Sequence, residues 1–316
     1  MSFLKSLFGS TDKESADEKQ KNEERNFDIL KYDGIRAHNV YRFDYAIQCF
    51  VKALEIHKDA EVYEHLSNCY TRVGRLEKAQ QALTEWTKFE PNNARPLSFL
   101  ANLAFIQEDY QLTYDACKQA LSLDPENPFL YYLMGRACNG LSNNPEATEQ
   151  LSKAIELQEN YTDAYLSRAH LFYEENDIPK AKKDVEKILS YDPENEDAII
   201  LQGDILLKEG KLEEAQTTYQ HIIDSNPFNR DAYIRLGSLY QGQKEWDKAI
   251  QLYNDAIEVL PEFVNAFIER RKCKEATGDV EGAKADAEII KKFTPTFDVG
   301  DAVPADYLQQ KQNIPF

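Results

Sequence analysis

The sequence lacks the long apolar run that a membrane-spanning helix requires. No stretch approaches the roughly 20 consecutive apolar residues needed to cross a bilayer. The first residues, MSFLKSLFG, also lack the continuous apolar segment of a secretory signal peptide. These two absences predict a cytoplasmic protein, in which the sequon Asn160-Tyr161-Thr162 carries no glycan.

Cysteine and positive charge are both scarce. The five cysteines are scattered: Cys49, Cys69, Cys117, Cys138 and Cys273. We expect buried, reduced thiols, because proteins of the cytosol keep few disulfides. The chain has 37 Lys and Arg against 55 Asp and Glu, a formal net charge of −18. Such a field repels DNA and RNA, which excludes nucleic acid as an expected partner.

Motifs of catalysis and cofactor binding are absent. The sequence contains no HExxH, no paired CxxC, no GxxxxGK[ST] and no GxSxG. Its five histidines are spread along the chain, and His65 with Cys69 would supply only two ligands, too few for a closed metal site. We therefore expect no enzymatic activity, no metal and no cofactor.

What the sequence has instead is a repeated unit, seen most clearly over residues 230–263. A first helix is indicated by apolar and small residues at i, i+3, i+4 and i+7, which are Tyr233, Leu236, Gly237 and Tyr240. A second helix shows the same spacing in Ala249, Leu252, Tyr253 and Ala256. Pro261 ends the second helix, because its ring and missing N–H cannot continue the hydrogen-bond ladder. Two such helices cannot bury both faces alone, so the unit requires copies beside it.

Copies follow with a period of 34 residues. The prolines that end second helices are Pro91, Pro125, Pro193, Pro227, Pro261 and Pro295. The single double-length step contains a repeat in which Glu159 replaces the proline. We read the repeats as 60–93, 94–127, 128–161, 162–195, 196–229, 230–263 and 264–297. An earlier copy, 27–59, fits with one residue fewer and no closing proline.

This unit resembles the tetratricopeptide repeat in the pattern Gly237, Tyr240, Trp246, Ala249, Tyr253, Ala256 and Pro261. The resemblance covers residues 27–297. It implies an all-α fold, a right-handed α-α superhelix of about eight helix-turn-helix repeats, with a C-terminal capping segment at 298–316. It specifies the fold better than the function, because this architecture serves many partners.

The two ends fall outside the period. Residues 1–25 are expected to form a flexible tail with a short amphipathic start, because residues 10–25 are too polar to fold alone. Residues 1–9 allow three interpretations: a hook for a membrane or partner, a frayed start, or a segment packed on the first repeat. Any membrane association is expected only through residues 1–9. At the other end, 298–316 is interpreted as a cap on the last repeat or as a disordered tail.

Two repeats share a polar departure from the pattern. Arg168 and Asp184 lie 16 residues apart, and so do Arg270 and Asp286, at the same repeat positions. Each arginine replaces the aliphatic residue seen as Leu236. We therefore predict a partly buried Arg–Asp bridge inside each of these repeats, with a structural role.

The resemblance also implies a binding surface. In tetratricopeptide arrays, side chains at repeat positions 2, 5, 9 and 12 of the first helices point into an inner groove. On this chain the predicted partner-binding groove comprises Asn102, Phe105, Phe129, Tyr132, Arg136, Asn139, Leu166, His170, Tyr173, Ile200, Asp204, Leu207 and Ile234. Many of these are the aromatic and apolar types that dominate binding hot spots. Packing between neighbouring first helices is the alternative explanation for each single residue.

One family activity can be tested by residue type. Members that hold a C-terminal carboxylate pair a lysine with an asparagine on one repeat. Here Asn68 and Asn102 match the asparagine, but the paired lysine positions are Glu64 and Ser98. An apolar or basic segment therefore suits the groove and the net charge better than an acidic tail.

The sequence as a whole predicts a non-catalytic scaffold that binds a peptide or helix of another protein. The alternative is a structural or self-assembling protein that acts through oligomerisation of its end repeats. The partner and the oligomeric state are left open.

Overall fold

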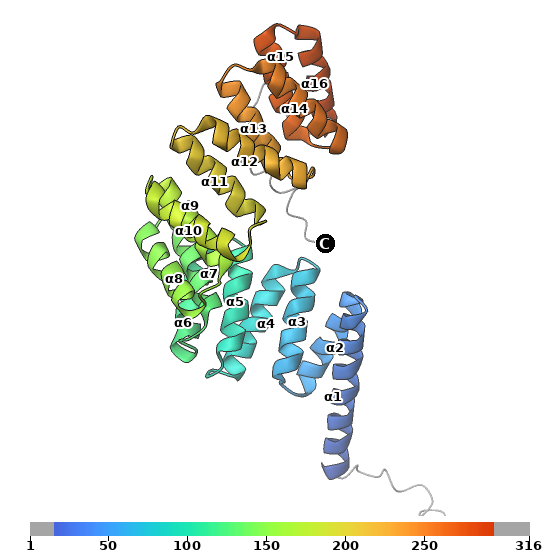
Figure 1. The fold of residues 1–316 in the computed structure, drawn as a ribbon. Helices are drawn as coiled ribbons and strands as arrows, with labels where there is room; N and C mark the ends of the chain where they lie inside the picture. Colours follow the sequence, from blue (N-terminus) through green and yellow to red (C-terminus); the bar gives the residue numbers. More distant parts are fainter. Residues whose placement is uncertain (1–15, 294–316) are drawn as a thin grey trace, which may run out of the picture. The chain divides into compact units, whose positions relative to one another are not determined.

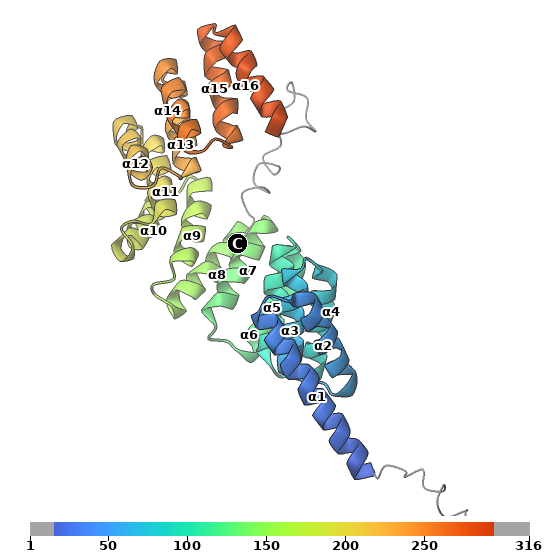
Figure 2. The ribbon, with the colours of Figure 1, turned by 90° about the vertical axis from the view of Figure 1, so that its right-hand side faces the viewer.

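The structure is a computed structural model that describes residues 16–293 (Figures 1 and 2). In this range every element is an α-helix, and consecutive helices pair as hairpins. The first helices are α1 (Ala16–Asn39), α3 (Ala60–Arg72), α5 (Ala94–Ile106), α7 (Pro128–Gly140), α9 (Thr162–Glu174), α11 (Glu196–Lys208), α13 (Arg230–Gly242) and α15 (Val264–Thr277). The second helices are α2 (Phe43–Ile56), α4 (Leu76–Phe89), α6 (Tyr110–Leu123), α8 (Asn144–Leu157), α10 (Ile178–Tyr191), α12 (Leu212–Ser225), α14 (Trp246–Val259) and α16 (Val280–Phe293). The prediction of an all-α helical repeat fold is confirmed.

The chain divides into two units, Met1–Ala164 and Tyr165–Phe316, and the division falls inside α9. Unit 1 contains α1 to α8, and unit 2 contains α10 to α16 with most of α9. The predicted segment 1–9 and the predicted cap at 298–316 lie outside the described residues.

The first helices from α3 to α15 begin at the first residue of each predicted repeat. Asparagines stand directly before several of them and stabilise the helix start. A backbone N–H in the first turn donates to the side chain of each of Asn93, Asn195 and Asn229. Such a cap satisfies a donor that the helix itself leaves free, and is worth about 1 kcal/mol.

Each hairpin turn places one residue in the left-handed region of backbone space. These residues are Tyr41, Gly74, Glu108, Ser142, Asn176, Gly210, Lys244 and Gly278, with φ between 59° and 80°, and from Gly74 on they follow the 34-residue period. Glycine takes this conformation freely and asparagine tolerates it, while the other side chains crowd the following carbonyl. The turn geometry is therefore kept throughout the array even where the residue type opposes it.

Inside two hairpins of unit 2, a glycine on the first helix meets a tyrosine on the second. A Cβ atom on Gly237 of α13 would overlap the Tyr253 ring of α14, and Gly203 of α11 meets Tyr219 of α12 in the same way. Both tyrosines are fully buried. The glycines therefore allow the two helices to pack around a ring that anchors the hairpin core.

The prediction of a flexible tail over residues 1–25 is wrong for the residues that belong to helix α1. This helix begins at Ala16, so residues 16–25 are helical and do not belong to a flexible tail. Glu, Lys, Gln and Arg in this segment are good helix formers, and Gln20 donates to Glu24 in an i,i+4 pair at 3.2 Å. The side chains of residues 18–26 are exposed. The segment therefore extends a packed helix into solvent without adding to the core.

The five cysteines are buried and free. Burial raises the pKa of Cys69 and Cys138 to about 11 and that of Cys117 to about 12. At neutral pH the reactive thiolate is therefore scarcely populated at these three positions.

The described part of the chain contains neither a candidate membrane span nor a cluster of metal ligands. Its helices include none with the length and apolar character to cross a membrane. Its His, Cys, Asp and Glu side chains form no group of three or more that could hold a metal ion.

Candidate partner-binding surface

The predicted groove residues lie on first helices and divide between the two units. In unit 1 they form a set on α5 and α7, here called the unit-1 wall: Asn102, Phe105, Phe129, Tyr132, Arg136 and Asn139. In unit 2 they form a set on α9, α11 and α13, here called the unit-2 wall: Leu166, His170, Tyr173, Ile200, Asp204, Leu207 and Ile234.

The unit-1 wall is built around Arg136. Its guanidinium carbon lies 4.5 Å from the ring centre of Phe105 and 5.7 Å from that of Tyr132. Its Nη1 donates a hydrogen bond to the Tyr132 hydroxyl at 3.0 Å. Stacking and hydrogen bonding therefore fix the arginine, which remains exposed to solvent.

Other members of the unit-1 wall are also accessible. Phe129 is 38% exposed, Asn102 and Asn139 are exposed, and Phe105 and Tyr132 are half-buried. Contact between first helices thus accounts for part of the aromatic surface but leaves much of it open.

Tyr161 belongs to the same cluster, although sequence analysis did not predict it. It lies in the connection before α9, and its ring centre is 5.1 Å from that of Tyr132. Burial raises the pKa of its hydroxyl. The prediction considered only first-helix positions, whereas this aromatic occupies a place where Asn127 and Asn195 stand in neighbouring repeats. The aromatic residue in place of asparagine was the feature of the sequence that could have identified Tyr161 as a member of the cluster.

In the unit-2 wall, Tyr173 carries a lysine on its ring. The Nζ of Lys208 lies 4.2 Å from the ring centre and donates to the Tyr173 backbone carbonyl at 3.2 Å. Lys208 was not among the predicted residues because it follows the predicted position Leu207 by one. Leu166, Leu207 and Ile234 are half-buried, and His170 is exposed at the surface.

Two predicted members of the unit-2 wall are buried instead. Ile200 is 8% exposed and Asp204 is 6% exposed, so neither offers a side chain to a partner. The Tyr219 hydroxyl donates to Asp204 Oδ1 at 2.6 Å, and Arg235 Nη2 lies 3.3 Å from Oδ2. Burial raises the pKa of Asp204, while the tyrosine and the arginine oppose that rise. The residue at position 9 of this repeat therefore packs inside the hairpin and does not line the wall.

The charges at the wall positions differ between the units. In unit 1, Arg95 is paired with Glu64 at 2.7 Å, while Arg136 contacts aromatic rings. In unit 2, Asp197 and Asp231 are exposed at position 2 of their repeats. The wall positions of α5 and α7 therefore carry arginines, whereas those of α11 and α13 carry aspartates.

The two arginine–aspartate pairs lie inside unit 2, away from the wall. Arg168 binds Asp184 side-on, through Nε at 2.8 Å and Nη2 at 2.7 Å. Arg270 binds Asp286 in the same manner, and Lys274 adds a bond to Asp286 at 2.9 Å. Both aspartates are buried. The geometry is that of strong, charge-assisted bonds between the helices of one hairpin.

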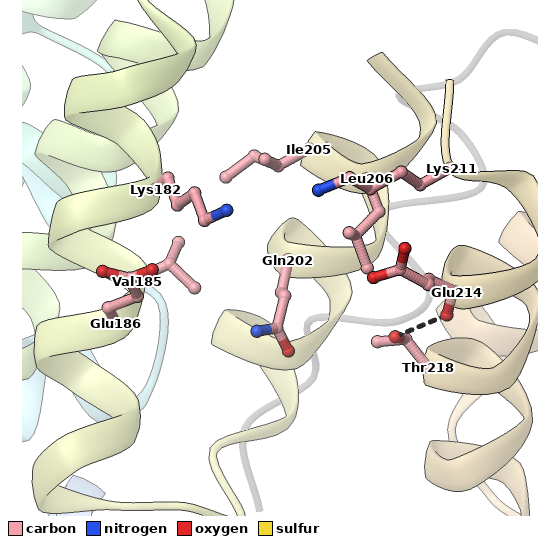
Figure 3. A pocket seen from close by; sticks show the side chains of 9 residues that line it. All are labelled: Lys182, Val185, Glu186, Gln202, Ile205, Leu206, Lys211, Glu214 and Thr218. Carbon is pink, nitrogen blue, oxygen red and sulfur yellow. Dashed lines mark hydrogen bonds between the residues drawn. The ribbon is translucent and has the colours of Figure 1, made fainter. Parts of the chain in front are cut away.

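A cleft of about 390 Å³ opens between α10, α11 and α12 on the second-helix side of unit 2 (Figure 3). Gln202 projects from α11 between the side chains of α10 and α12. Lys182 and Lys211 line the cleft. Glu209 forms an ion pair with each, at 3.7 Å from Lys182 Nζ and 2.7 Å from Lys211 Nζ. A comparable cleft of about 400 Å³ lies between α2, α3 and α4 in unit 1. The recurrence indicates that such clefts come from the stacking of hairpins.

Residues 68–283 match the family described as "Tetratricopeptide repeat protein 21 N-terminal ARM repeat". Among curated proteins, cellulose synthase operon protein C of Pseudomonas fluorescens (strain SBW25) is 34% identical over 93 residues, 29% of this chain and 7% of that protein. Protein STIP1 homolog of Dictyostelium discoideum is 34% identical over 73 residues, 23% of this chain and 13% of that protein. Tetratricopeptide repeat protein 13 of Homo sapiens is 24% identical over 139 residues, 44% of this chain and 16% of that protein. The matches thus span a small part of the length of these relatives.

Two solved structures share the fold. A tetratricopeptide repeat protein from Parabacteroides merdae ATCC 43184 is similar with a TM-score of 0.63 and 17% identity, covering 77% of this chain and 98% of that one. Pseudomonas aeruginosa pilF is similar with a TM-score of 0.55 and 18% identity, covering 67% of this chain and 96% of that one. At such identities the likeness concerns the fold alone.

Proposed function

Since this chain belongs to the family described as tetratricopeptide repeat protein 21 N-terminal ARM repeat, we propose that it is a non-catalytic scaffold holding a peptide or helix of another protein on its first-helix walls. One observation carries the proposal: aromatic and aliphatic side chains remain accessible on first helices of both units. Phe129 is 38% exposed, and Tyr132, Tyr173 and Leu207 are half-buried. Accessible apolar groups next to polar ones are the usual composition of a protein-binding surface.

The walls also have little side-chain freedom to lose on binding. Arg136 is stacked and hydrogen-bonded to Tyr132, and Lys208 is held on Tyr173. Ordering a free side chain at an interface costs about 0.5–1.5 kcal/mol. Residues that are already fixed avoid part of that cost, which supports a binding role for these positions.

The test is capture of a partner by the full chain carrying Tyr132→Ala and Tyr173→Ala together. We expect the captured amount to fall while helicity by circular dichroism is unchanged. A matched control replaces Phe89 and Tyr191, exposed aromatics on second helices, with alanine. If the wall variant captures the partner as well as the wild type, or if the control loses it equally, the wall assignment fails.

A second candidate function is self-assembly through the first hairpin. Ile29 is 48% exposed and Tyr32 is 57% exposed on α1. Later repeats bury the residue that corresponds to Ile29, for example Ala198 and Ala232, against the preceding hairpin. The first hairpin therefore leaves open a face that a second copy of the chain could cover.

Light scattering on the full chain separates the two candidates. A dimer or larger assembly that Ile29→Glu converts to a monomer supports self-assembly. A strict monomer over a wide concentration range contradicts self-assembly and is compatible with the scaffold function.

A further inference from the structure

The second-helix side of unit 2 carries a cleft that the proposed function does not use. The cleft of about 390 Å³ between α10, α11 and α12 adjoins a second hollow of about 430 Å³, and the two share Gln202, Glu214 and Thr218. Together they follow α11 from Ile199 to Leu206. At 1.5 Å per residue this floor is about 10 Å long, which matches about three residues of an extended chain.

The floor of the cleft holds an unused amide. Gln202 projects from α11 into the space between α10 and α12 (Figure 3). Its side chain is half-buried, and within residues 16–293 its amide has no hydrogen-bond partner. The neighbouring Thr218 hydroxyl donates to the Glu214 backbone carbonyl at 2.8 Å and so does not serve the amide. A carboxamide offers both a donor and an acceptor, which an extended backbone complements with its C=O and N–H groups.

The walls of the cleft carry two carboxylates without an ion-pair partner. Glu186 on α10 and Glu214 on α12 are exposed, and among the described residues neither has a cation within 4.0 Å. The lysines of the same cleft, Lys182 and Lys211, are both paired with Glu209. The charges that remain open in the cleft are therefore negative, which favours a basic ligand.

The corresponding cleft of unit 1 has a different chemistry. It lies between α2, α3 and α4 and is lined by the same repeat positions. The positions of the two glutamates and the glutamine of unit 2 hold Val51, Lys78 and Leu66 in unit 1. Stacking of hairpins produces a hollow in both units. It does not account for the polar and acidic lining of the hollow in unit 2.

We propose that the cleft over α11 is a second docking site, and that it binds a short extended segment of another protein that carries Lys or Arg. Gln202 bonds to the backbone of this segment, while Glu186 and Glu214 attract its basic side chains. A helical ligand would leave the Gln202 amide unpaired, because the backbone groups of a helix bond to one another. The site is separate from the first-helix walls, so the inference goes beyond the proposed function and does not rest on it.

The test is a selection of random displayed peptides by the full wild-type chain. We expect a group of peptides in which Lys or Arg recurs at a fixed position. The triple variant Glu186→Val, Gln202→Leu and Glu214→Lys gives this cleft the residues of unit 1 and should abolish the group. Gln202→Leu alone should weaken the binding of a selected synthetic peptide about tenfold, as measured by fluorescence anisotropy, because it removes the bonds to the backbone.

A matched control separates the cleft from the acidity of the whole chain. Asp247→Lys with Glu258→Lys changes two exposed residues of α14, outside the cleft, and raises the net charge by more than the triple variant does. This control should keep the basic group of peptides. If it loses them as the triple variant does, the attraction is non-specific and the docking site is refuted.

Two other results would overturn the proposal. Peptides that depend on Gln202 but become helical on binding, by circular dichroism, would exclude an extended ligand. Peptides that depend on Gln202 but carry Asp or Glu would contradict the assigned charge.

The outcomes also distinguish this site from the walls. Tyr132→Ala with Tyr173→Ala should leave the binding of the basic peptide unchanged, and a loss there would place the peptide on the walls and refute the docking site. If no selected peptide depends on the cleft residues, the docking site is refuted while the proposed function keeps its own test. Circular dichroism of each variant verifies that the helices are intact.

Discussion

The two units use different chemistry at the same place inside their hairpins. Positions 7 and 23 of a repeat face each other across the two helices. In unit 1 they hold pairs such as Leu66 with Ala82, both buried. In two hairpins of unit 2 the same positions hold ion pairs, such as Arg168 with Asp184 at side-chain exposures of 17% and 5%, whereas a third hairpin keeps Leu236 with Leu252. The backbone accommodates both because the period alone sets which positions meet.

The walls of the two units also differ in the charged residues that they carry. Unit 1 presents a stacked, unneutralised arginine, whereas unit 2 buries Asp204 and exposes Asp197 and Asp231. Net charge alone favoured an apolar or basic partner for the whole chain. In unit 1 the stacked Arg136 is an exposed positive group that the overall charge does not describe.

The largest expected effect concerns the buried charges of unit 2. Arg168→Leu should lower the free energy of unfolding by about 3–5 kcal/mol, because it leaves Asp184 buried without its partner. Changing both residues to leucine should restore stability to near the wild-type value, since Leu236 and Leu252 fill these positions in another repeat. Urea unfolding, with hydrogen exchange of α9 and α10, measures both. A double variant as unstable as the single one would show that the pair itself is required.

A smaller loss is expected from Tyr219→Phe. The change removes the hydrogen bond to Asp204 and should destabilise unit 2 by about 1–3 kcal/mol. The control is Tyr253→Phe, where the hydroxyl accepts a longer bond, 3.2 Å, from the partly buried Gln241. Thermal unfolding should show the larger shift for Tyr219→Phe, and equal shifts would contradict the role given to Asp204.

A pH effect should mark unit 1. Burial, and then the neighbouring His38, lower the pKa of His65 below its usual 6.5. The unfolded chain therefore binds the proton first, and stability is lost as pH falls from about 6.5 through the lower pKa of the folded state. His65→Gln should remove this part of the pH dependence, as measured by hydrogen exchange of α3. The control is His221, an exposed histidine of the other unit, and its change to Gln should leave the hydrogen exchange of α3 unaltered.

The smallest effect should be the same in both units, because the turns do not depend on the interior. Glu108→Gly in unit 1 and Lys244→Gly in unit 2 replace left-handed residues with φ of 59° and 61°. Each should raise the free energy of unfolding by about 1 kcal/mol. Gly74→Ala should lower it by a similar amount. Unequal gains in the two units would mean that neighbouring contacts, and not the turn, limit stability.

The repeat boundaries could be predicted because each depends on local rules. Asparagine before a helix and glycine in the turn mark the ends wherever they fall on the chain, and the 34-residue period joins them. The limit of α1 could not be predicted in the same way. A polar segment such as 16–25 becomes helical when a packed helix continues from it. That packing belongs to the tertiary structure and is not specified by the local sequence.

The candidate surface was predicted only in part. Wall positions were implied by the resemblance to tetratricopeptide repeats, but burial decided that Ile200 and Asp204 face inward. Tyr161 was missed because it lies outside the first helices and reaches Tyr132 only through the chain's folding.

The sequence by itself determined the all-α repeat, because spacing alone dictates which side chains share a helical face. It also placed each arginine–aspartate pair in one hairpin, since positions 16 residues apart meet across the turn. Only the tertiary structure decided which charges lie in ion pairs and which contact aromatic rings. Neutralisation depends on distances between side chains of different repeats, as between Arg95 and Glu64, and a linear pattern does not specify those distances.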